Sequence, residues 1–231
     1  MKEKISAIVL AGGQGKRMNA PIQKQYLELN GYPVLYYSLK ELEQSEVDEI
    51  ILVVGKNEID YANEKIVKQY GFKKIRQIVA GGRERYESVY NGLQAIQDDG
   101  YVFIHDGARP LLSQDIIKRG IEGVKQYGAC VVGMPVKDTI KVVDEKQYVK
   151  ETPNREFLWL IQTPQIFRIS KIKEAYDKMW ETGDSSVTDD AMVMEKYGNL
   201  KVKLIKGSYQ NIKITTPEDI LIATSLLQNM E

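Results

Sequence analysis

The chain has 231 residues, of which 43% are hydrophobic and 28% are charged, as in ordinary soluble globular proteins of one or two domains. Lysine plus arginine equals aspartate plus glutamate, at 32 each, so no overall positive charge points to nucleic acid and any anion site must be local. We expect no signal peptide and no membrane span, because no apolar segment has the required length. The single cysteine, Cys130, cannot form an internal disulfide, and a cytoplasmic location is expected.

Apolar runs typical of buried strands alternate with segments of helical periodicity. The predicted strands are Ile5–Leu10, Glu49–Val54, Ile75–Val79, Tyr101–Ile104, Ala129–Met134 and Val202–Ile205. The predicted helices are Val34–Glu43, Glu58–Tyr70, Arg83–Ile96, Gln114–Tyr127 and, behind a Thr-Pro-Glu-Asp start, Ile220–Leu227. The alternation predicts an α/β fold in which an open, mostly parallel, twisted sheet carries helices on both faces, as in Rossmann-like proteins. No linker is evident, so residues 1–231 are expected to form one domain.

Residues 137–152 break the alternation. Apolar and polar residues follow one another here in turn, with a polar turn at Asp144–Gln147, which predicts a β-hairpin. The hairpin has few apolar residues for a core of its own, and an isolated hairpin is marginal in water. We therefore expect an inserted arm that projects and packs on something else, such as a second subunit. A hairpin lying on its own domain is an equally good interpretation of the sequence alone.

The first predicted strand runs into a glycine-rich turn, Leu-Ala-Gly-Gly-Gln-Gly-Lys-Arg-Met, at residues 10–18. Glycines let the backbone approach a ligand closely, and Lys16 and Arg17 add positive charge, a combination that suits a polyphosphate. A Walker A loop is excluded because Leu10 occupies the position of its first glycine. A dinucleotide fingerprint is excluded because Met18 occupies the position of its last glycine. The turn alone equally allows a strand-to-helix connection without a ligand.

A second group of polar residues follows the predicted strand Tyr101–Ile104. Ligands of open parallel sheets bind beyond the carboxyl ends of the strands, so Asp106 is expected to face the same crevice as the glycine turn. A single carboxylate in such a crevice can hold Mg²⁺ together with substrate phosphates. A local ion pair between Asp106 and Arg109 accounts for the same residues without a metal. The only histidine, His105, is expected to be structural.

Weaker signals occur elsewhere in the chain. Backbone groups at Gly81 and Gly82, with the Ser88 hydroxyl, could bond the edge of a base. Arg155, just beyond the hairpin, could clamp a phosphate or pair with a neighbouring glutamate on the surface. Lys213 lies in an apolar run and is either solvated or turned into a polar crevice. Residues 188–191, Thr-Asp-Asp-Ala, read as the cap and first acidic turn of a helix, which explains them without a substrate.

In their order and spacing, these motifs resemble one family along nearly the whole chain: the 2-C-methyl-D-erythritol 4-phosphate cytidylyltransferases of the non-mevalonate isoprenoid route. The matching stretches are Leu-Ala-Gly-Gly-Gln-Gly-Lys-Arg-Met, Lys-Gln-Tyr-Leu, Gly-Gly-Arg-Glu-Arg, His-Asp-Gly-Ala-Arg-Pro, Asp-Thr-Ile-Lys, Leu-Trp-x-x-Gln-Thr-Pro-Gln, Thr-Asp-Asp-Ala and Asn-Ile-Lys-Ile-Thr. The resemblance implies a Mg²⁺-dependent transfer of CMP from CTP to the polyol phosphate, with release of pyrophosphate. It also implies a homodimer joined by the hairpin arm.

The resemblance further implies roles for individual residues. Catalytic roles fall to Arg17, Lys24 and Lys213. The nucleotide would contact Ala11, Gly12, Gly13, Gly15, Arg17, Lys24, Gly81, Gly82 and Ser88. The acceptor would lie among Asp106, Arg109, Thr139, Arg155, Thr163, Thr188 and Lys213, with Asp106 also holding Mg²⁺. Thr139 and Arg155 would serve the site of the neighbouring subunit.

Some positions depart from the family pattern. Gly12 and Gly107 stand where the family often has alanine, and both changes are expected to preserve access and to loosen the loops. The Gly-Gly form of the first loop also occurs in ribitol-5-phosphate cytidylyltransferases. Those usually have Ser-Asp-Ala-Cys in place of residues 188–191 and lack the Leu158-Trp159 pair, which favours methylerythritol phosphate as the acceptor. A nucleotide-binding module without turnover is the remaining alternative.

Overall fold

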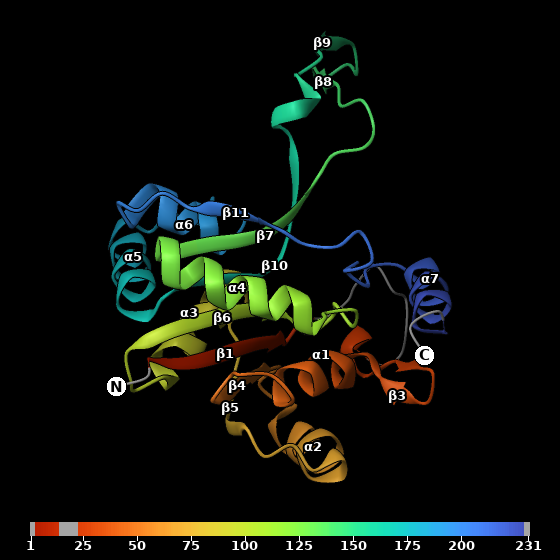
Figure 1. The fold of residues 1–231 in the computed structure, drawn as a ribbon, viewed down its shortest axis with the longest axis vertical. Helices are drawn as coiled ribbons and strands as arrows, with labels where there is room; N and C mark the ends of the chain where they lie inside the picture. Colours follow the sequence, from red (N-terminus) through yellow and green to blue (C-terminus); the bar gives the residue numbers. More distant parts are fainter. Residues whose placement is uncertain (1–2, 14–22, 229–231) are drawn as a thin grey trace.

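The computed structural model describes residues 3–13 and 23–228, and seven of the described strands form one sheet (Figure 1). Its order is β11-β7-β10-β6-β1-β4-β5. These strands are β1 (Lys4–Ala11), β4 (Glu49–Val54), β5 (Ile75–Ala80), β6 (Gly100–Asp106), β7 (Ala129–Pro135), β10 (Trp159–Arg168) and β11 (Lys203–Lys206). All six predicted strands are confirmed, and the sheet is parallel except for β10.

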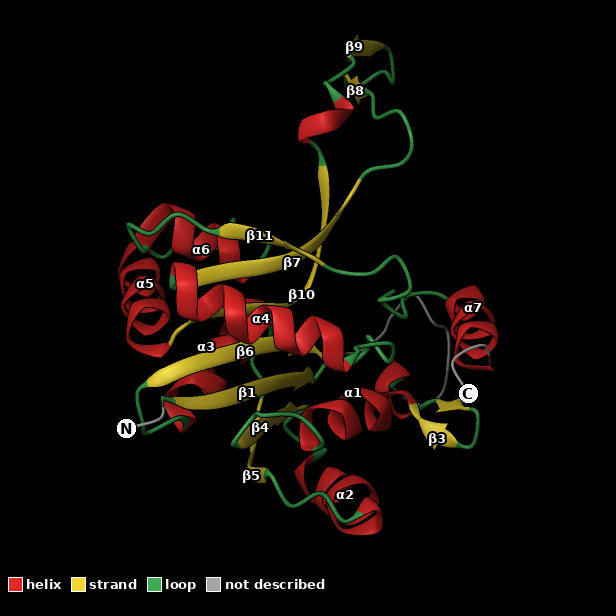
Figure 2. Ribbon diagram, in the orientation of Figure 1, coloured by secondary structure: helices red, strands yellow, loops and turns green. Residues whose placement is uncertain are grey.

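Helices cover both faces of the sheet, as predicted (Figure 2). One face packs against α1 (Val34–Glu43), α4 (Gln114–Tyr127) and the continuous pair α2 (Ile59–Ala62) and η3 (Asn63–Lys68). The other face packs against α3 (Arg85–Ala95), α5 (Ile169–Thr182) and α6 (Asp190–Tyr197).

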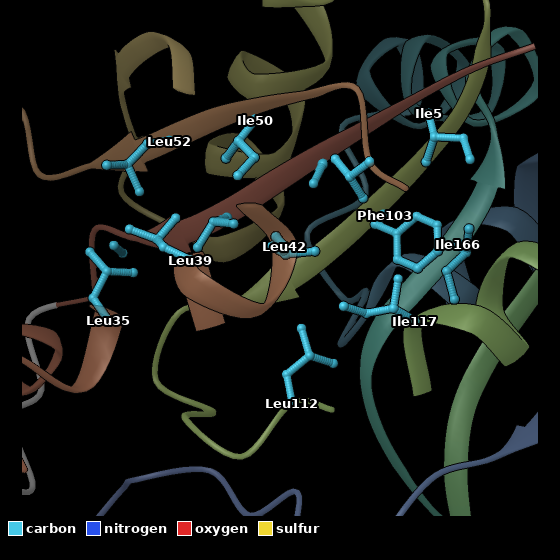
Figure 3. Close-up of a cluster of buried hydrophobic side chains, with 14 of the residues drawn as sticks. Ile5, Leu35, Leu39, Leu42, Ile50, Leu52, Phe103, Leu112, Ile117 and Ile166 are labelled. Atoms are coloured by element: carbon cyan, nitrogen blue, oxygen red, sulfur yellow. The ribbon is translucent and has the colours of Figure 1, made fainter. Parts of the chain in front are cut away.

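The apolar strands are buried because each contributes side chains to both layers. In β1, Ile5, Ala7 and Val9 point into the layer with α1 and α4, while Ile8 points into the layer with α3. Figure 3 shows the first layer, in which Phe103 of β6 lies beside Ile166 of β10 and Ile117 of α4. Burial on both faces explains why these strands read as continuous apolar runs.

The strand β10 was not predicted. It lies antiparallel between β6 and β7, near the middle of the sheet, although Pro164 argues against a central strand because it lacks a backbone N–H. The pairing of β10 with β7 shifts register between Ile161 and Gln165, so the ladder is interrupted where the proline falls. The peptide bond between Thr163 and Pro164 is cis.

The predicted hairpin arm projects beyond the sheet (Figure 1). It contains β8 (Val142–Val143) and β9 (Val149–Glu151), and in the structure the arm extends past its predicted end at residue 152 to include the short helix η4 (Arg155–Phe157). Asp144 Oδ1 closes the turn by accepting the N–H groups of Lys146 and Tyr148, each at 2.9 Å. Tyr148 and Phe157 are 71% and 77% exposed within this chain. The projection of the arm is confirmed, whereas its packing on a second subunit stays a prediction.

The remaining elements form a small layer at one end of the sheet. They are η2 (Lys24–Tyr26), the short pair β2 (Glu28–Leu29) and β3 (Tyr32–Pro33), and α7 (Pro217–Gln228). α7 packs on Leu29, Val34 and Ile214 through Ala223. Asp219 Oδ2 accepts the N–H groups of Thr215 and Thr216 at 2.8 Å, which fixes the predicted helix start. Across the described residues, no helix has the length and apolar character needed to cross a membrane.

Candidate active site

The sheet reverses its strand order at β1. From β1 the chain moves outward to β4 and β5 and then returns to place β6 on the other side of β1. Loops that follow parallel strands on either side of such a reversal frame a crevice. A cavity of about 190 Å³ lies there, lined by Leu10, Ala11, Gly12, Gly13, Lys24, Gln25, Gly82, Arg83, Glu84, Arg85, Ser88, Asp106, Ala108 and Lys213. Eight residues of the predicted site therefore share one cavity: Ala11, Gly12, Gly13, Lys24, Gly82, Ser88, Asp106 and Lys213.

The glycine turns border this cavity from two strands. The described part of the first turn ends at Gly13, and the predicted residues Gly15 and Arg17 lie outside the described residues. On the other side, the Ser88 hydroxyl accepts the N–H of Gly82 at 3.0 Å, so that side chain stiffens the second turn. Gly81 borders an adjoining wider hollow of about 1040 Å³, which Gly12, Gly13 and Gly82 also line.

Lys24 reaches the cavity from η2 and is held by the far end of the chain. Its Nζ donates to the carbonyl of Ile214 at 2.9 Å. The neighbouring Gln25 is buried, and its Nε2 donates to the carbonyl of Ala11 at the end of β1. These contacts place a positive charge next to the first glycine turn.

Asp106 ends β6 at the floor of the cavity and faces three cations. Lys213 Nζ lies 2.7 Å from its Oδ2, Arg85 Nε lies 3.3 Å from its Oδ1, and Arg109 Nε lies 3.9 Å from its Oδ2. Burial alone would raise the pKa of this carboxyl, but the charges of Arg85, Lys213 and Arg109 outweigh burial and hold the pKa far below its ordinary range. Asp106 is therefore ionised at neutral pH.

Lys213 is in a loop rather than in the strand-like conformation that its apolar neighbours favoured. The N–H of the next residue, Ile214, donates to the carbonyl of Ala108 at 2.8 Å. This bond ties the lysine to the loop that follows Asp106. The sequence allowed Lys213 to be either solvated or turned into a polar crevice, and the structure shows that it is turned into the crevice.

His105 is fully buried and structural, as predicted. The N–H of Asp106 donates to the Thr163 hydroxyl oxygen at 3.0 Å, and that hydroxyl lies 3.1 Å from His105 Nδ1. His105 Nε2 lies 3.4 Å from the carbonyl of Arg109. Since a carbonyl only accepts, the proton is on Nε2 and Thr163 donates to Nδ1. Burial lowers the pKa of His105 to about 4, so the ring is neutral. Thr163 thus supports Asp106 from behind instead of lining the cavity.

Arg85, the first residue of α3, was not singled out from the sequence. Its Nη1 and Nη2 donate to the two oxygens of Asp190 at 3.0 and 2.8 Å, while its Nε faces Asp106. Burial opposes the charge of Arg85, yet Asp190 and Asp106 raise its pKa well above the usual value. The residue stands inside the Gly-Gly-Arg-Glu-Arg stretch, but its two partners become visible only once the chain is folded.

The helix start predicted at residues 188–191 is confirmed in part. Asp189 Oδ1 caps α6 by accepting the N–H of Met192 at 2.9 Å. Capping does not explain Asp190, which is fully buried and bonded to Arg85 and to the Tyr176 hydroxyl. The interpretation that a helix cap with first-turn acids fully explains residues 188–191 is therefore wrong for Asp190.

The other predicted acceptor residues lie outside the cavity of this chain. Arg109 is bonded to the carbonyl of Asn211 at 2.7 Å, and Thr188 borders a small hollow behind Arg85. Thr139 and Arg155 are exposed on the arm, where Arg155 Nη1 donates to the carbonyl of Lys137 at 2.9 Å. The arm that carries both residues projects away from the sheet (Figure 1).

The glycine at position 107 makes room for packing rather than for access to a ligand, and the expected loosening of its loop stays a prediction. A Cβ built there would lie 2.6 Å from Leu35 Cδ1 and 3.1 Å from the carbonyl oxygen of Leu10. Position 107 therefore faces α1 and the end of β1. The glycine lets Leu35 pack tightly beneath the loop that carries Asp106.

Two acidic residues line the cavity, but the Glu84 side chain is engaged in the capping box at the start of α3, which leaves Asp106 as the carboxylate for a divalent cation. No group of three or more histidine, cysteine, aspartate or glutamate side chains that could hold a metal occurs within residues 3–13 and 23–228. A lone carboxylate fits Mg²⁺, which commonly takes one or two carboxylates and completes its shell with phosphate oxygens and water. It does not fit a metal held by the protein alone.

The cavity brings together glycine turns at the ends of β1 and β5, a carboxylate at the end of β6, and lysines from η2 and from the loop before α7. This set of groups defines a nucleotidyltransferase of the α/β class. The family described as "IspD: 2-C-methyl-D-erythritol 4-phosphate cytidylyltransferase" matches residues 5–229. The chain belongs to this family.

Individual relatives are similar to this chain over almost the full length of both proteins. A protein of Lachnospira eligens named 2-C-methyl-D-erythritol 4-phosphate cytidylyltransferase is 56% identical over 225 residues, which cover 96% of this chain and 99% of the relative. The crystal structure of 4-diphosphocytidyl-2C-methyl-D-erythritol synthase from Anaerococcus prevotii superposes with a TM-score of 0.86 at 37% identity, covering 98% and 96% of the two chains. That of the Francisella tularensis cytidylyltransferase gives a TM-score of 0.80 at 31% identity, covering 96% and 99%.

Proposed function

We propose that the protein transfers CMP from CTP to 2-C-methyl-D-erythritol 4-phosphate and releases pyrophosphate. The observation that carries this proposal is the meeting of Lys24, Asp106 and Lys213 with both glycine turns in one cavity at the carboxyl ends of the strands. The family membership supplies the nucleotide and the acceptor.

The chemical step joins two anions. An oxygen of the acceptor phosphate attacks the α-phosphorus of CTP, and the bond from that phosphorus to the bridging oxygen of the β-phosphate breaks with its electron pair leaving on pyrophosphate. The acceptor phosphate is already ionised at neutral pH, so no side chain has to remove a proton. The neutral, buried His105 agrees with this absence of a general base.

The side chains of the cavity lower the barrier by opposing charge repulsion. Lys24 lies beside the first glycine turn, where the phosphates of CTP are expected, and its Nζ bonds the carbonyl of Ile214, the residue after Lys213, so that two lysines line the same cavity. Arg17, outside the described residues, is expected to join Lys24 at the α-phosphate. Preorganised cations of this kind stabilise charge that develops in the transition state. Gly81, Gly82 and Ser88 are the proposed contacts to cytosine.

Asp106 is the proposed ligand for Mg²⁺, which would neutralise phosphate charge when bound with CTP. Lys213, whose Nζ lies 2.7 Å from Oδ2 of the same carboxylate, would supply further positive charge beside the bound phosphates.

The arm is the proposed contact between two subunits. Its exposed apolar residues, Tyr148, Val149 and Phe157 among them, need a partner surface. The arm that carries Thr139 and Arg155 projects away from the sheet, and neither residue lines the cavity of its own chain, which agrees with a role in the site of a second copy. Arg109 and Thr188 are proposed to bound the acceptor side, while Thr163 supports Asp106 from behind. The cytoplasm is the expected compartment.

A pyrophosphate-release assay with CTP, Mg²⁺ and separate acceptors tests the proposal. We expect rapid release with 2-C-methyl-D-erythritol 4-phosphate and at least a hundredfold less with ribitol 5-phosphate. A preference for ribitol 5-phosphate would change the acceptor but keep the reaction. Binding of CTP without release in the presence of either acceptor would contradict enzymatic function.

A further inference from the structure

Asp190, the first residue of α6, is a buried carboxylate next to the cavity but not part of its lining. Its side chain is 0% exposed. Its two oxygens accept Nη1 and Nη2 of Arg85 at 3.0 and 2.8 Å, and the Tyr176 hydroxyl donates to Oδ1 at 2.6 Å. A two-point contact of this kind fixes both the plane and the direction of the guanidinium group.

The same guanidinium also approaches Asp106, but by a weaker contact. Arg85 Nε lies 3.3 Å from Asp106 Oδ1, whereas Lys213 Nζ lies 2.7 Å from Oδ2 of the same carboxylate. One positive charge is therefore divided unequally between Asp190 and Asp106. If Asp190 were neutral, the guanidinium could turn to make a full two-point ion pair with Asp106, which would occupy both oxygens.

We propose that Asp190 is a positioning residue for CMP transfer. It holds Arg85 at a distance that steadies Asp106 without closing a full ion pair, and so leaves Oδ2 of Asp106 to Lys213 and to the reactants. Asp190 lines no part of the cavity, so it acts only through Arg85. This role rests on the proposed function, because it presupposes that Asp106 and Lys213 serve the transfer.

Asp190 can act as an anchor because α6 is itself fixed to the sheet. Gln165 of β10 donates through Nε2 to Asp189 at 2.9 Å and accepts the N–H of Ala191 at 2.9 Å. The two residues on either side of Asp190 are thus bound to one buried glutamine. The position of Arg85, and through it that of Asp106, is set by the central part of the sheet.

The ion pair also joins the two sides of the crevice. Arg85 directly follows the turn that contains Gly82, on the proposed nucleotide side, and Asp190 directly follows Thr188 and Asp189, on the proposed acceptor side. Loss of this ion pair is expected to change the relative position of the two bound reactants more than it changes the affinity for either reactant. The turnover number is therefore the sensitive quantity.

The test measures kcat per binding-competent site. Calorimetry with CTP gives the number of competent sites in each preparation, and initial rates with CTP and 2-C-methyl-D-erythritol 4-phosphate are divided by that number. For Asp190→Asn we expect kcat per site to fall at least tenfold, with the KM for CTP within threefold of wild type. A merely structural role would reduce the number of competent sites and leave kcat per site unchanged, which would overturn the proposal.

Two further variants keep the test decisive. Arg85→Lys retains one positive charge but cannot make the two-point contact and the contact to Asp106 together, so it should also lose at least tenfold in kcat per site. It replaces Asp190→Asn if that variant does not fold. The double variant Arg85→Gln/Asp190→Asn should be no slower per site than Arg85→Gln alone, because Asp190 acts through Arg85. A clearly slower double variant would overturn that dependence.

Asp184→Asn is the matched control. Asp184 lies in the segment before α6, where it contacts Lys196 at 3.0 Å and the Tyr197 hydroxyl at 2.7 Å, without contact to Arg85. Its kcat per site should equal that of wild type. Wild type without any CMP transfer would refute the proposed function and this role together. Wild-type turnover with an equally fast Asp190→Asn would refute this role alone.

Discussion

Lys213 Nζ lies 2.7 Å from Oδ2 of Asp106, although one residue belongs to the loop before α7 and the other ends β6. The contact holds the lysine at the floor of the cavity before any substrate arrives. The same contact pairs the charge of Lys213 with the carboxylate that is expected to bind Mg²⁺. The two residues thus form the electrostatic centre of the proposed transfer.

Lys213→Ala should lower kcat by about a hundredfold or more, the scale of losing one preorganised donor at the reacting centre. Steady-state rates with both substrates saturating measure this. The exposed Lys118 on α4 supplies the control, because Lys118→Ala removes an equal charge from a residue that does not line the cavity and should keep wild-type turnover. Near-normal turnover of Lys213→Ala would remove this residue from the transition state.

Lys24→Gln should lose nearly as much turnover as Lys24→Ala, again about a hundredfold or more in kcat. Glutamine keeps a donor for the carbonyl of Ile214, which Lys24 now bonds at 2.9 Å, but lacks the positive charge. Comparison of the two variants shows whether Lys24 acts through its hydrogen bond to Ile214 or through its positive charge. A glutamine variant as fast as wild type would mean that the tether alone matters.

Arg155→Ala should raise the KM for the acceptor about tenfold or more and leave the KM for CTP unchanged, because the lost contact is made before the transition state. Lys150→Ala, an exposed change on the same arm, is the control. Mixing Arg155→Ala subunits with Lys213→Ala subunits should restore activity, since a mixed dimer contains one intact site. Failure of every mixture to recover activity would contradict the shared site.

His105 should titrate with a pKa of about 4, which proton NMR can follow without ambiguity because the chain has one histidine. The folded state holds the ring neutral, while the unfolded chain binds a proton below about pH 6.5. Stability contributed by this group is therefore present above that pH and is lost as the pH falls toward 4, by about 3 kcal/mol. A titration midpoint near 6.5 would show that the ring is not buried.

Cys130 should be inert in the folded protein. Burial raises the pKa of its thiol to about 12, and the side chain is 0% exposed in β7. Ellman's reagent at pH 8 should find no thiol in the native state and one thiol per chain in denaturant. Rapid reaction of the native protein would contradict the packing of β7 against α4.

Much of the fold follows from local patterns. Runs such as Glu49–Val54 are apolar because the strands are covered on both faces, and the glycines and Asp106 follow such runs directly. Strand β10 escaped prediction because Pro164 interrupts its ladder. Helix α5 was overlooked, although Ile169, Ile172, Tyr176 and Met179 recur at helical spacing and are all buried.

The cavity residues that belong to one short sequence motif could be predicted from the sequence. Those that depend on contacts between residues far apart in the chain could not. The turn at Gly82 and Ser88 is local, and so is the position of Asp106 at a strand end. The pairing of Arg85 with Asp190 joins residues on different helices, and no local pattern reveals it. From the sequence alone, Asp190 is indistinguishable from the many acidic residues that occupy the first turn of a helix.

The central claim is that the acceptor phosphate attacks the α-phosphorus of CTP, and tracing the oxygen atoms of that phosphate tests it most directly. With ¹⁸O in the phosphate of 2-C-methyl-D-erythritol 4-phosphate, phosphorus NMR and mass spectrometry of the products follow the bond that forms. Attack by that phosphate on the α-phosphorus of CTP predicts ¹⁸O in the new diphosphate bridge and none in the released pyrophosphate. Label in the pyrophosphate, or no nucleotide product at all, would contradict the account.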